Sequence, residues 1–109
     1  PPNTDISQKN YISIWMEDKA IGVLDLIEGY PEKTSVWISL LLVHGSLHSK
    51  KIGGSIVNAV LTSAKKVGYR SIQLGVNESN VRGLAFWERY GFNVFRQNQS
   101  VVIMAKRIV

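Results

Sequence analysis

The 109-residue sequence predicts a single α/β domain, in which helices pack on the faces of a mixed, mostly antiparallel central sheet. Two β-rich segments separated by a short polar turn begin the chain, which is the pattern of an antiparallel hairpin. Two later segments have the apolar spacing of helices, and each follows a β-rich segment. No repeat, low-complexity tract or linker interrupts residues 1–109, so hairpins and crossover helices belong to one domain.

The first two strands are expected at residues 11–16 and 20–27, because both segments are rich in aliphatic and β-branched residues. Residues 17–19 (Glu-Asp-Lys) form the turn between them, and residues 29–31 (Gly-Tyr-Pro) end the second strand.

The third strand is expected to end near residue 43. One of its faces carries every second residue of the segment, and these residues are apolar: Val36, Ile38, Leu40 and Leu42. The other face is also apolar, with Trp37, Leu41 and Val43. A strand that is apolar on both faces lies inside a covered sheet rather than at its edge.

The first helix is expected over residues 50–67, with Gly68 as its C-terminal stop. Its helically spaced apolar positions are Ile52, Ile56, Ala59, Val60, Ala64 and Val67. A strand with alternating Ile72, Leu74 and Val76 follows. Residues 77–80 then cap a second helix over residues 81–89, which Gly91 ends. Two short strands, at 93–95 and 101–105, complete the chain.

Composition excludes several classes of site. The chain has no cysteine, which excludes a disulfide scaffold, a thiol nucleophile and cysteine-ligated metals. Its two histidines do not have the spacing of a metal motif, so no metal is expected. No apolar run in the chain, including residues 40–43, is long enough to cross a membrane. Without a basic-then-apolar leader, we expect a cytoplasmic protein with no membrane partner.

Charge is distributed unevenly along the chain. Residues 1–49 contain three Lys or Arg against six Asp or Glu, whereas residues 50–109 contain ten against two. A basic half attracts anionic ligands, either nucleic acid or a phosphorylated cofactor. The alternative is a solvated surface that has no partner.

Residues 49–55 (Ser-Lys-Lys-Ile-Gly-Gly-Ser) join the third strand to the first helix. The start of a helix has unpaired backbone N–H groups and a partial positive charge, so it can bind phosphate. Gly53 and Gly54 would let a diphosphate approach the backbone, and Lys50 and Lys51 would add positive charge. The sequence matches neither the P-loop nor the dinucleotide-binding motif. A need for small residues where the helix packs closely explains the two glycines equally well.

The second segment of interest runs from a strand end through Asn80 into a short aromatic helix. Asn80 can cap the helix or hydrogen-bond a ligand that carries amides. Phe86, Trp87 and Tyr90 cannot all point the same way, so at least one of them belongs to the core.

Together these segments resemble the GNAT superfamily of acetyl-coenzyme A-dependent N-acyltransferases. The first signature of that family, an apolar strand and then R/Q-x-x-G-x-G/A at a helix start, resembles residues 41–54. Gly53 matches, whereas His48 and Lys51 depart from the pattern. The second signature, an Asn and then a helix ending in Tyr-Glu-Lys-Leu-Gly-Phe, resembles Asn80 with residues 86–92, where Trp87 replaces the tyrosine.

The resemblance implies a GNAT-like fold and transfer of an acetyl group from acetyl-coenzyme A to a primary amine, by direct attack. Backbone groups near Leu42 and Val43 would hold the pantetheine arm, and Asn80 would bond its amides. The diphosphate would lie on the amides of Lys50, Lys51, Ile52, Gly53, Gly54 and Ser55.

The resemblance also suggests catalytic residues. His44 would be the base, with Glu28 as the second choice. Trp87 would donate a hydrogen bond to the departing thiolate, while Tyr90 takes the place of a packing leucine. The alternative function is a coenzyme A-binding or regulatory module without catalysis. The sequence does not identify the acceptor amine.

Members of the family usually have a strand and one or two helices before the hairpin, and here the chain starts almost at the hairpin. We therefore expect an N-terminally truncated GNAT-like fold with uncovered apolar surface near Tyr11, Ile14 and Trp15. Because large apolar patches bind partners, we also expect a homodimer that covers part of the hairpin or the C-terminal strand. Without a recognition helix or an aromatic platform, no nucleic-acid partner is expected.

Overall fold

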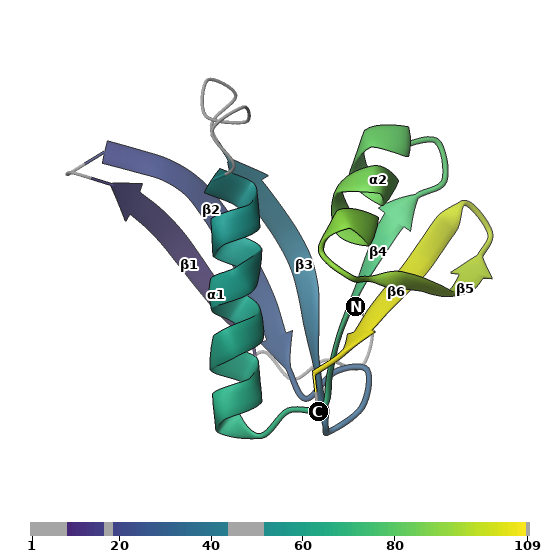
Figure 1. Cartoon of the computed structure of the whole chain (residues 1–109), viewed down its shortest axis with the longest axis horizontal. Coiled ribbons are helices and arrows are strands. Elements are labelled where there is room, and N and C mark those ends of the chain that lie inside the picture. The colour runs from purple at the N-terminus through teal and green to yellow at the C-terminus, as the bar shows by residue number, and fades with distance from the viewer. Residues whose placement is uncertain (1–8, 17–18, 44–51, 109) are drawn as a thin grey trace.

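The computed structural model describes residues 9–16, 19–43 and 52–108, which form six strands and two helices (Figure 1). In chain order these are β1 (Lys9–Met16), β2 (Lys19–Glu28), β3 (Ser35–Val43), α1 (Ile52–Val67), β4 (Ser71–Asn77), α2 (Val81–Arg89), β5 (Asn93–Asn98) and β6 (Val101–Arg107). Every predicted element is present. The last two strands are longer than predicted, because β5 pairs with β6 as far as Asn98 and β6 pairs with β4 as far as Arg107.

The six strands form one sheet in the order β1-β2-β3-β4-β6-β5. Neighbouring strands are antiparallel except β3 and β4, which run parallel and are connected through α1. A parallel pair requires a crossover connection, and a helix is the usual one. The structure thereby confirms the mixed, mostly antiparallel sheet.

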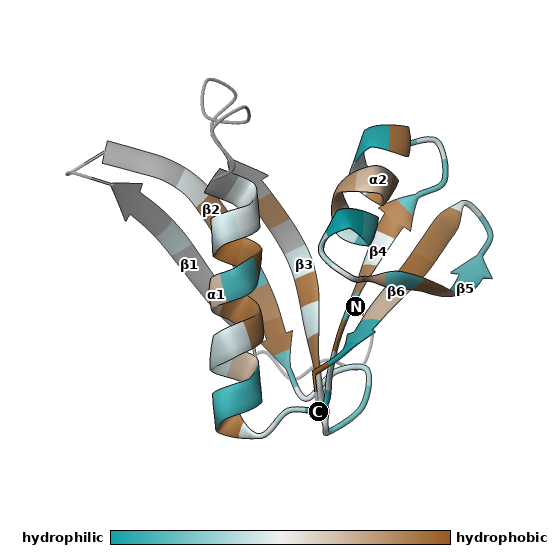
Figure 2. Ribbon diagram, viewed as in Figure 1, coloured by the Kyte–Doolittle hydropathy of each residue, from teal (hydrophilic) through white to brown (hydrophobic). Residues whose placement is uncertain are grey.

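Both helices lie on the same face of the sheet, α1 over β2 and β3 and α2 over β4 (Figure 1). The sequence does not say which face each helix covers. Hydrophobic residues are frequent along β3, β4 and β6 (Figure 2). The core between the helices and the sheet contains Leu24, Val36, Ile38, Val57, Val60, Ala64, Ile72, Leu74, Val76, Trp87, Phe92, Val102, Met104 and Ile108.

The buried stripe of α1 differs from the predicted one. Val57, which was not among the predicted apolar positions, is 1% exposed, whereas Val67 is 70% exposed. Ala59 is exposed as well. A helix on a sheet covers only one stripe of its surface, so apolar residues at the edge of that stripe remain outside the core.

Candidate functional site

A cleft opens between β3 and β4, because the two strands pair over only part of their length. The paired region has four registered pairs, beginning with Ser35 opposite Ser71 and ending with Ile38 opposite Leu74. β3 continues to Val43 and β4 to Asn77, and the strands separate beyond the paired region (Figure 1). Over the separated segments, the backbone groups on the facing edges do not pair with each other. A ligand that lies between the strands can reach them.

Ser39 is an extra residue of β3 at the point where this strand leaves β4. On the β2 side, Ile38 pairs with Leu26 and Leu40 pairs with Asp25, so that Ser39 has no opposite residue. A β-bulge of this kind bends its strand and increases the local twist. The bulge therefore accounts for the divergence of β3 from β4.

The bulge also changes which residues of β3 share a face. Leu41 pairs with Leu24, packs against the core and lines the cleft together with Ile38. The predicted alternation along β3 is therefore wrong beyond Ile38, because one inserted residue shifts a pattern whose period is two.

A cavity of about 260 Å³ lies in the cleft. β3, β4, the N-cap of α2 and the last turn of α2 supply its lining, which is Ile38, Ser39, Leu41, Leu74, Gly75, Val76, Asn77, Asn80 and Trp87. None of these side chains is charged. A hydroxyl, two primary amides and an indole N–H accompany the apolar groups, and this combination suits an elongated neutral ligand that carries amides.

Trp87 forms one wall of this cavity and is 9% exposed. Its ring meets those of Phe86 and Phe92 edge-on, at centroid distances of 5.0 Å and 5.2 Å. The indole N–H donates to no residue that the structure describes. Aromatic packing therefore fixes the ring and leaves its donor for a ligand.

Asn80 caps α2, and its Oδ1 accepts a hydrogen bond from the Gly83 backbone N–H at 2.9 Å. A Cβ on residue 83 would lie 2.5 Å from Nδ2 of Asn80, so glycine makes room for the cap. Nδ2 itself has no acceptor in the described part of the chain. Capping through the oxygen and donation to a ligand through the nitrogen are therefore compatible.

The first turn of α1 packs against α2. A Cβ on Gly53 would lie 3.3 Å from the ring of Phe86, and a Cβ on Gly54 would overlap the hydroxyl of Tyr90. The glycines thus allow the two helices to meet, as the packing explanation requires. The same turn contains no acidic residue, so no side chain in it opposes an anion at the N-terminus of the helix.

Tyr90 is half-buried rather than a fully buried core residue. Its ring lies 5.1 Å from that of Phe86 and its hydroxyl lies against Gly54. Lys106 Nζ donates to the Tyr90 carbonyl at 2.9 Å, at the C-terminal end of α2. The ring is therefore packed as the sequence predicts, while the hydroxyl reaches the first turn of α1.

The remaining predicted cofactor residues lie around the open end of the cleft or outside the described residues. Leu42 and Val43 end β3, while Ile52 begins α1 and Ser55 is exposed in its first turn. The predicted residues that lie outside the described ranges are His44, Lys50 and Lys51.

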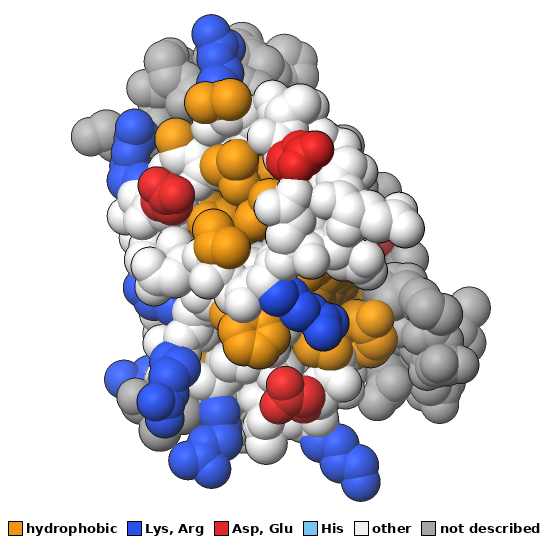
Figure 3. All heavy atoms as spheres, turned by 90° about the vertical axis from the view of Figure 1, so that its right-hand side faces the viewer, with side chains coloured by type: hydrophobic (Ala, Val, Ile, Leu, Met, Phe, Trp, Pro, Cys, Tyr) orange, Lys and Arg blue, Asp and Glu red, His pale blue; other side chains and the backbone are white. Residues whose placement is uncertain are grey.

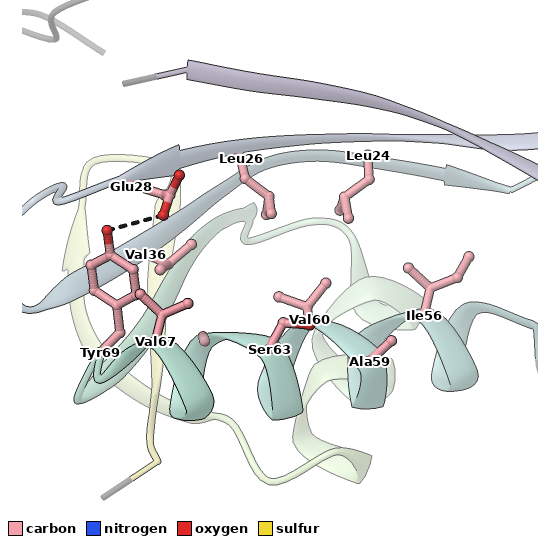
Figure 4. Close-up of a pocket in the computed structure, with 11 residues that line it drawn as sticks. Leu24, Leu26, Glu28, Val36, Ile56, Ala59, Val60, Ser63, Val67 and Tyr69 are labelled. Atoms are coloured by element: carbon pink, nitrogen blue, oxygen red, sulfur yellow. Dashed lines mark hydrogen bonds between the residues drawn. The ribbon is translucent and has the colours of Figure 1, made fainter. Parts of the chain in front are cut away.

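Glu28 lies away from the cleft, beside Val36 at the paired end of β3. It lines a second cavity, between β2 and α1, where its Oε1 accepts a hydrogen bond from the Tyr69 hydroxyl at 3.1 Å (Figure 4). Burial, with this hydrogen bond and the charge of Glu28, raises the pKa of Tyr69. The structure does not bring Glu28 to Trp87 or Asn80.

Asn77 is a cleft residue that sequence reasoning treated only as part of a helix cap. Its Oδ1 accepts hydrogen bonds from the Ser79 backbone N–H at 2.9 Å and the Ser79 hydroxyl at 2.7 Å. These bonds turn the chain from β4 toward α2. An asparagine at the end of a buried strand was the available signal, whereas nothing in the sequence marks Ser39 as a bulge.

Lys and Arg side chains predominate over Asp and Glu on the face shown in Figure 3. Among the described residues no three His, Asp or Glu side chains come together as a metal site would require. Neither α1 nor α2 has the length and apolar character needed to cross a membrane.

Comparison with known proteins identifies the family from the sequence and related folds from the structure. The model of the acetyltransferase (GNAT) family matches residues 3–92. An uncharacterized N-acetyltransferase, YvbK of Bacillus subtilis (strain 168), is 30% identical over 80 residues, which are 73% of this chain and 50% of that protein. The chain thus spans half the length of this curated relative.

Two solved structures share the fold. PaiA N-acetyltransferase from Thermoplasma acidophilum, in complex with coenzyme A, superposes with a TM-score of 0.82 at 23% identity, over 92% of this chain and 61% of that one. An acetyltransferase from Thermus thermophilus gives a TM-score of 0.85 at 20% identity, over 94% and 66%.

Proposed function

Because this chain belongs to the acetyltransferase (GNAT) family, we propose that it binds acetyl-coenzyme A between β3 and β4 and transfers the acetyl group to a primary amine. The observation that carries the proposal is the separation of β3 from β4 beyond Ile38 and Leu74, with Trp87 and Asn80 beside the resulting cavity. The PaiA structure, which shares this fold, holds coenzyme A.

The residues of the cleft fit the pantetheine arm, which is uncharged and carries two amides. The cavity lining is uncharged, and Nδ2 of Asn80 is a donor without an acceptor in the described chain. Leu42 and Val43 belong to the part of β3 that has left β4, so their backbone groups can pair with the arm as a neighbouring strand would. Nδ2 of Asn80 then donates a hydrogen bond to the pantetheine side of the cofactor.

The diphosphate is assigned to the first turn of α1, with the backbone amides of Gly53, Gly54 and Ser55 as donors. This turn contains no acidic residue, and Lys50 and Lys51 precede it in the sequence. The Tyr90 hydroxyl reaches the same turn. The charge of the lysines adds attraction, while the backbone amides supply direction.

The reaction needs a neutral amine whose nitrogen lone pair attacks the thioester carbonyl carbon. A carbon–nitrogen bond forms, the carbon–sulfur bond breaks, and the sulfur leaves with its electron pair. One proton leaves the nitrogen for a base. The indole N–H of Trp87 stabilises the thiolate by a hydrogen bond but does not give up its proton.

We assign the base to His44. β3 ends at Val43, on the side where the cleft is open, and His44 is the next residue. Histidine changes charge near neutral pH, which suits proton removal from an ammonium or amine. Glu28 is omitted from this assignment, because it lies beside Val36 at the paired end of β3.

A coenzyme A-binding module without catalysis is the second candidate. Trp87 favours it, because an indole cannot act as a proton donor to sulfur where the family resemblance predicts a tyrosine. Both candidates require the same cleft, so only turnover separates them.

We also propose a homodimer. β5 is a sheet edge whose six residues are all exposed, and Val94 and Phe95 on it are 59% and 60% exposed. Apolar groups on an edge strand favour pairing with another chain. Light scattering at tens of micromolar protein should show twice the mass of one chain, and a single-chain mass would reject the dimer.

Thiol release tests the proposed activity. The chain is incubated with acetyl-coenzyme A and, separately, an aminoglycoside, a polyamine, an amino acid and a peptide with a free N-terminus. Transfer predicts thiol release that depends on one amine class, with the acetylated amine identified by mass. Binding of acetyl-coenzyme A without turnover on any amine would favour the non-catalytic module, and absence of binding would reject both.

A further inference from the structure

A second cavity, of about 370 Å³, lies between β2 and α1 and takes no part in the proposed transfer (Figure 4). Leu24 and Leu26 of β2 point toward Ile56, Val60 and Val67 of α1 across it. The cavity is therefore a groove with apolar walls on two elements, and it opens to solvent along the helix.

The groove exists because α1 turns Val57 to the core, leaving other apolar positions at the edge of its buried stripe. Val67 is 70% exposed and Ala59 is exposed, and both line the groove. Removing apolar surface from water is favourable. A ligand with an apolar body therefore gains free energy by lying along this side of α1.

One end of the groove is polar. Glu28 and Tyr69 meet there through a hydrogen bond of 3.1 Å from the phenol hydroxyl to the carboxylate (Figure 4). Glu28 carries the only charge among the described residues that line the groove. A carboxylate accepts several hydrogen bonds at once, so a ligand donor can join Tyr69 and whatever else already contacts Glu28.

We propose that this groove binds an amphipathic amine, whose ammonium group contacts Glu28 at the Tyr69 end and whose apolar body lies between Leu26 and Val60. The raised pKa of Tyr69 agrees with this assignment, because the phenol then stays protonated and keeps donating to Glu28. An anionic amphiphile of the same shape would place its charge against a carboxylate.

The dimensions favour a small molecule over a second protein chain. Small-molecule sites commonly enclose roughly 300–1,000 Å³, are mostly apolar and have a few polar groups that orient the ligand. A stable protein partner buries roughly 800 Å² on each side, more than one narrow groove provides. The site also differs from the cleft, since the groove and the cleft share no lining residue in the described part of the chain.

Titration of the full chain with three probes of equal shape tests the proposal: 4-phenylbutylammonium, 4-phenylbutanol and 4-phenylbutyrate. Backbone amide NMR shifts report both affinity and location. We expect the ammonium to bind about tenfold or more tightly than the carboxylate, with shifts at Ala59, Ser63 and Tyr69. Equal affinity for the charged probes, or shifts confined to the β3–β4 cleft, would overturn the proposal.

Two variants separate charge from shape. Glu28→Gln keeps a hydrogen-bond acceptor and should bring the ammonium and the alcohol to within about threefold of each other. Ser63→Trp should fill the groove from α1 and weaken all three probes. The matched controls are Glu78→Gln and Thr62→Trp, at exposed positions outside the groove lining, and should change nothing.

The proposal does not depend on acetyl transfer, because it is read from binding alone. If neither ammonium nor alcohol binds, and Ser63→Trp instead halves the mass measured by light scattering, a second copy occupies the groove and the amine assignment is wrong. Binding that survives Ser63→Trp unchanged would also refute it.

Discussion

Ile38 and Leu41 lie on the same face of β3, although a strand without a bulge would place them on opposite faces. The extra residue, Ser39, brings both to the wall of one cavity and bends β3 away from β4. The same local feature thus opens the cleft and supplies its apolar wall. Core packing of Leu41 then holds the separated strand in place.

The paired end of the cleft depends on two serine hydroxyls. Ser35 and Ser71 are hydrogen-bonded at 2.7 Å, and Ser35 is 0% exposed. Ser71→Ala leaves the Ser35 hydroxyl buried without this partner and should lower the free energy of unfolding by about 1–3 kcal/mol. Urea denaturation measures this loss in the free energy of unfolding. The double variant with Ser35→Ala should lose less than the sum of the two single losses, and simple additivity would contradict the account.

The contact between Gly54 and Tyr90 should be sensitive to a single methyl group. Gly54→Ala places a Cβ on the Tyr90 hydroxyl and should destabilise the chain by about 1–3 kcal/mol. Adding Tyr90→Ala should remove most of this extra penalty, because the overlapping group is gone. Asn58→Ala, at an exposed position of the same helix, serves as the control and should stay within about 0.5 kcal/mol.

The two functions of Asn80 can be separated by substitution. Asn80→Asp keeps an oxygen for the Gly83 N–H and should leave stability within about 0.5 kcal/mol, whereas Asn80→Ala should cost about 0.5–2 kcal/mol. Only the amide Nδ2 can donate to pantetheine, so both variants should weaken acetyl-coenzyme A binding by about tenfold. If Asn80→Asp binds as the unaltered chain does, Asn80 is a cap and not a cofactor ligand.

Trp87→Tyr should increase acetyl transfer on any accepted amine by about tenfold or more, because a phenol can supply the proton that indole keeps. Affinity for acetyl-coenzyme A should stay within a few-fold. Trp87→Phe is the matched control: it shrinks the same buried ring without adding a hydroxyl and should not raise the rate. A rate that rises equally in both variants would show that space, rather than the proton, limits the reaction. Loss of turnover in both Trp87→Tyr and Tyr90→Phe would identify Tyr90 as the proton donor.

Tyr69 should titrate above the ordinary pH range of a tyrosine, because burial and then Glu28 raise its pKa. The difference in alkaline absorbance between the unaltered chain and Tyr69→Phe should isolate this titration, and Glu28→Gln should shift it downward. Since the folded pKa is raised, the associated stability is complete below about pH 10, the ordinary value for tyrosine. It is lost as pH rises through the raised value. An unchanged titration in Tyr69→Phe would contradict the assignment.

Local signals were sufficient to predict α2. Asn80 before it and Gly91 after it are strong start and stop residues, and α2 runs from Val81 to Arg89 as predicted. Gly91 has φ +92°, a conformation that glycine adopts without strain, and this conformation explains the stop. The succession of strands and helices along the chain likewise followed from short-range patterns, whereas the place of β6 between β4 and β5 in the sheet was not predicted.

Features that depend on distant partners were not predictable from these patterns. The bulge at Ser39 is defined by pairing with β2, and the buried stripe of α1 is set by the sheet beneath it. Glu28 is close to Tyr69 only in the fold, 41 residues apart in sequence, so its distance from the cleft could not be read from the chain.

The central claim is that acetyl-coenzyme A binds in the cleft between β3 and β4, and calorimetric titration of acetyl-coenzyme A into the folded chain tests it most directly. Ser39→Trp is the blocking variant. Asn98→Trp, on exposed β5, is the matched control. A tryptophan at the bulge should occupy the cleft. The account predicts saturable binding by the unaltered chain and by Asn98→Trp, and none by folded Ser39→Trp. Absence of binding by the unaltered chain, or equal affinity in Ser39→Trp, would contradict it.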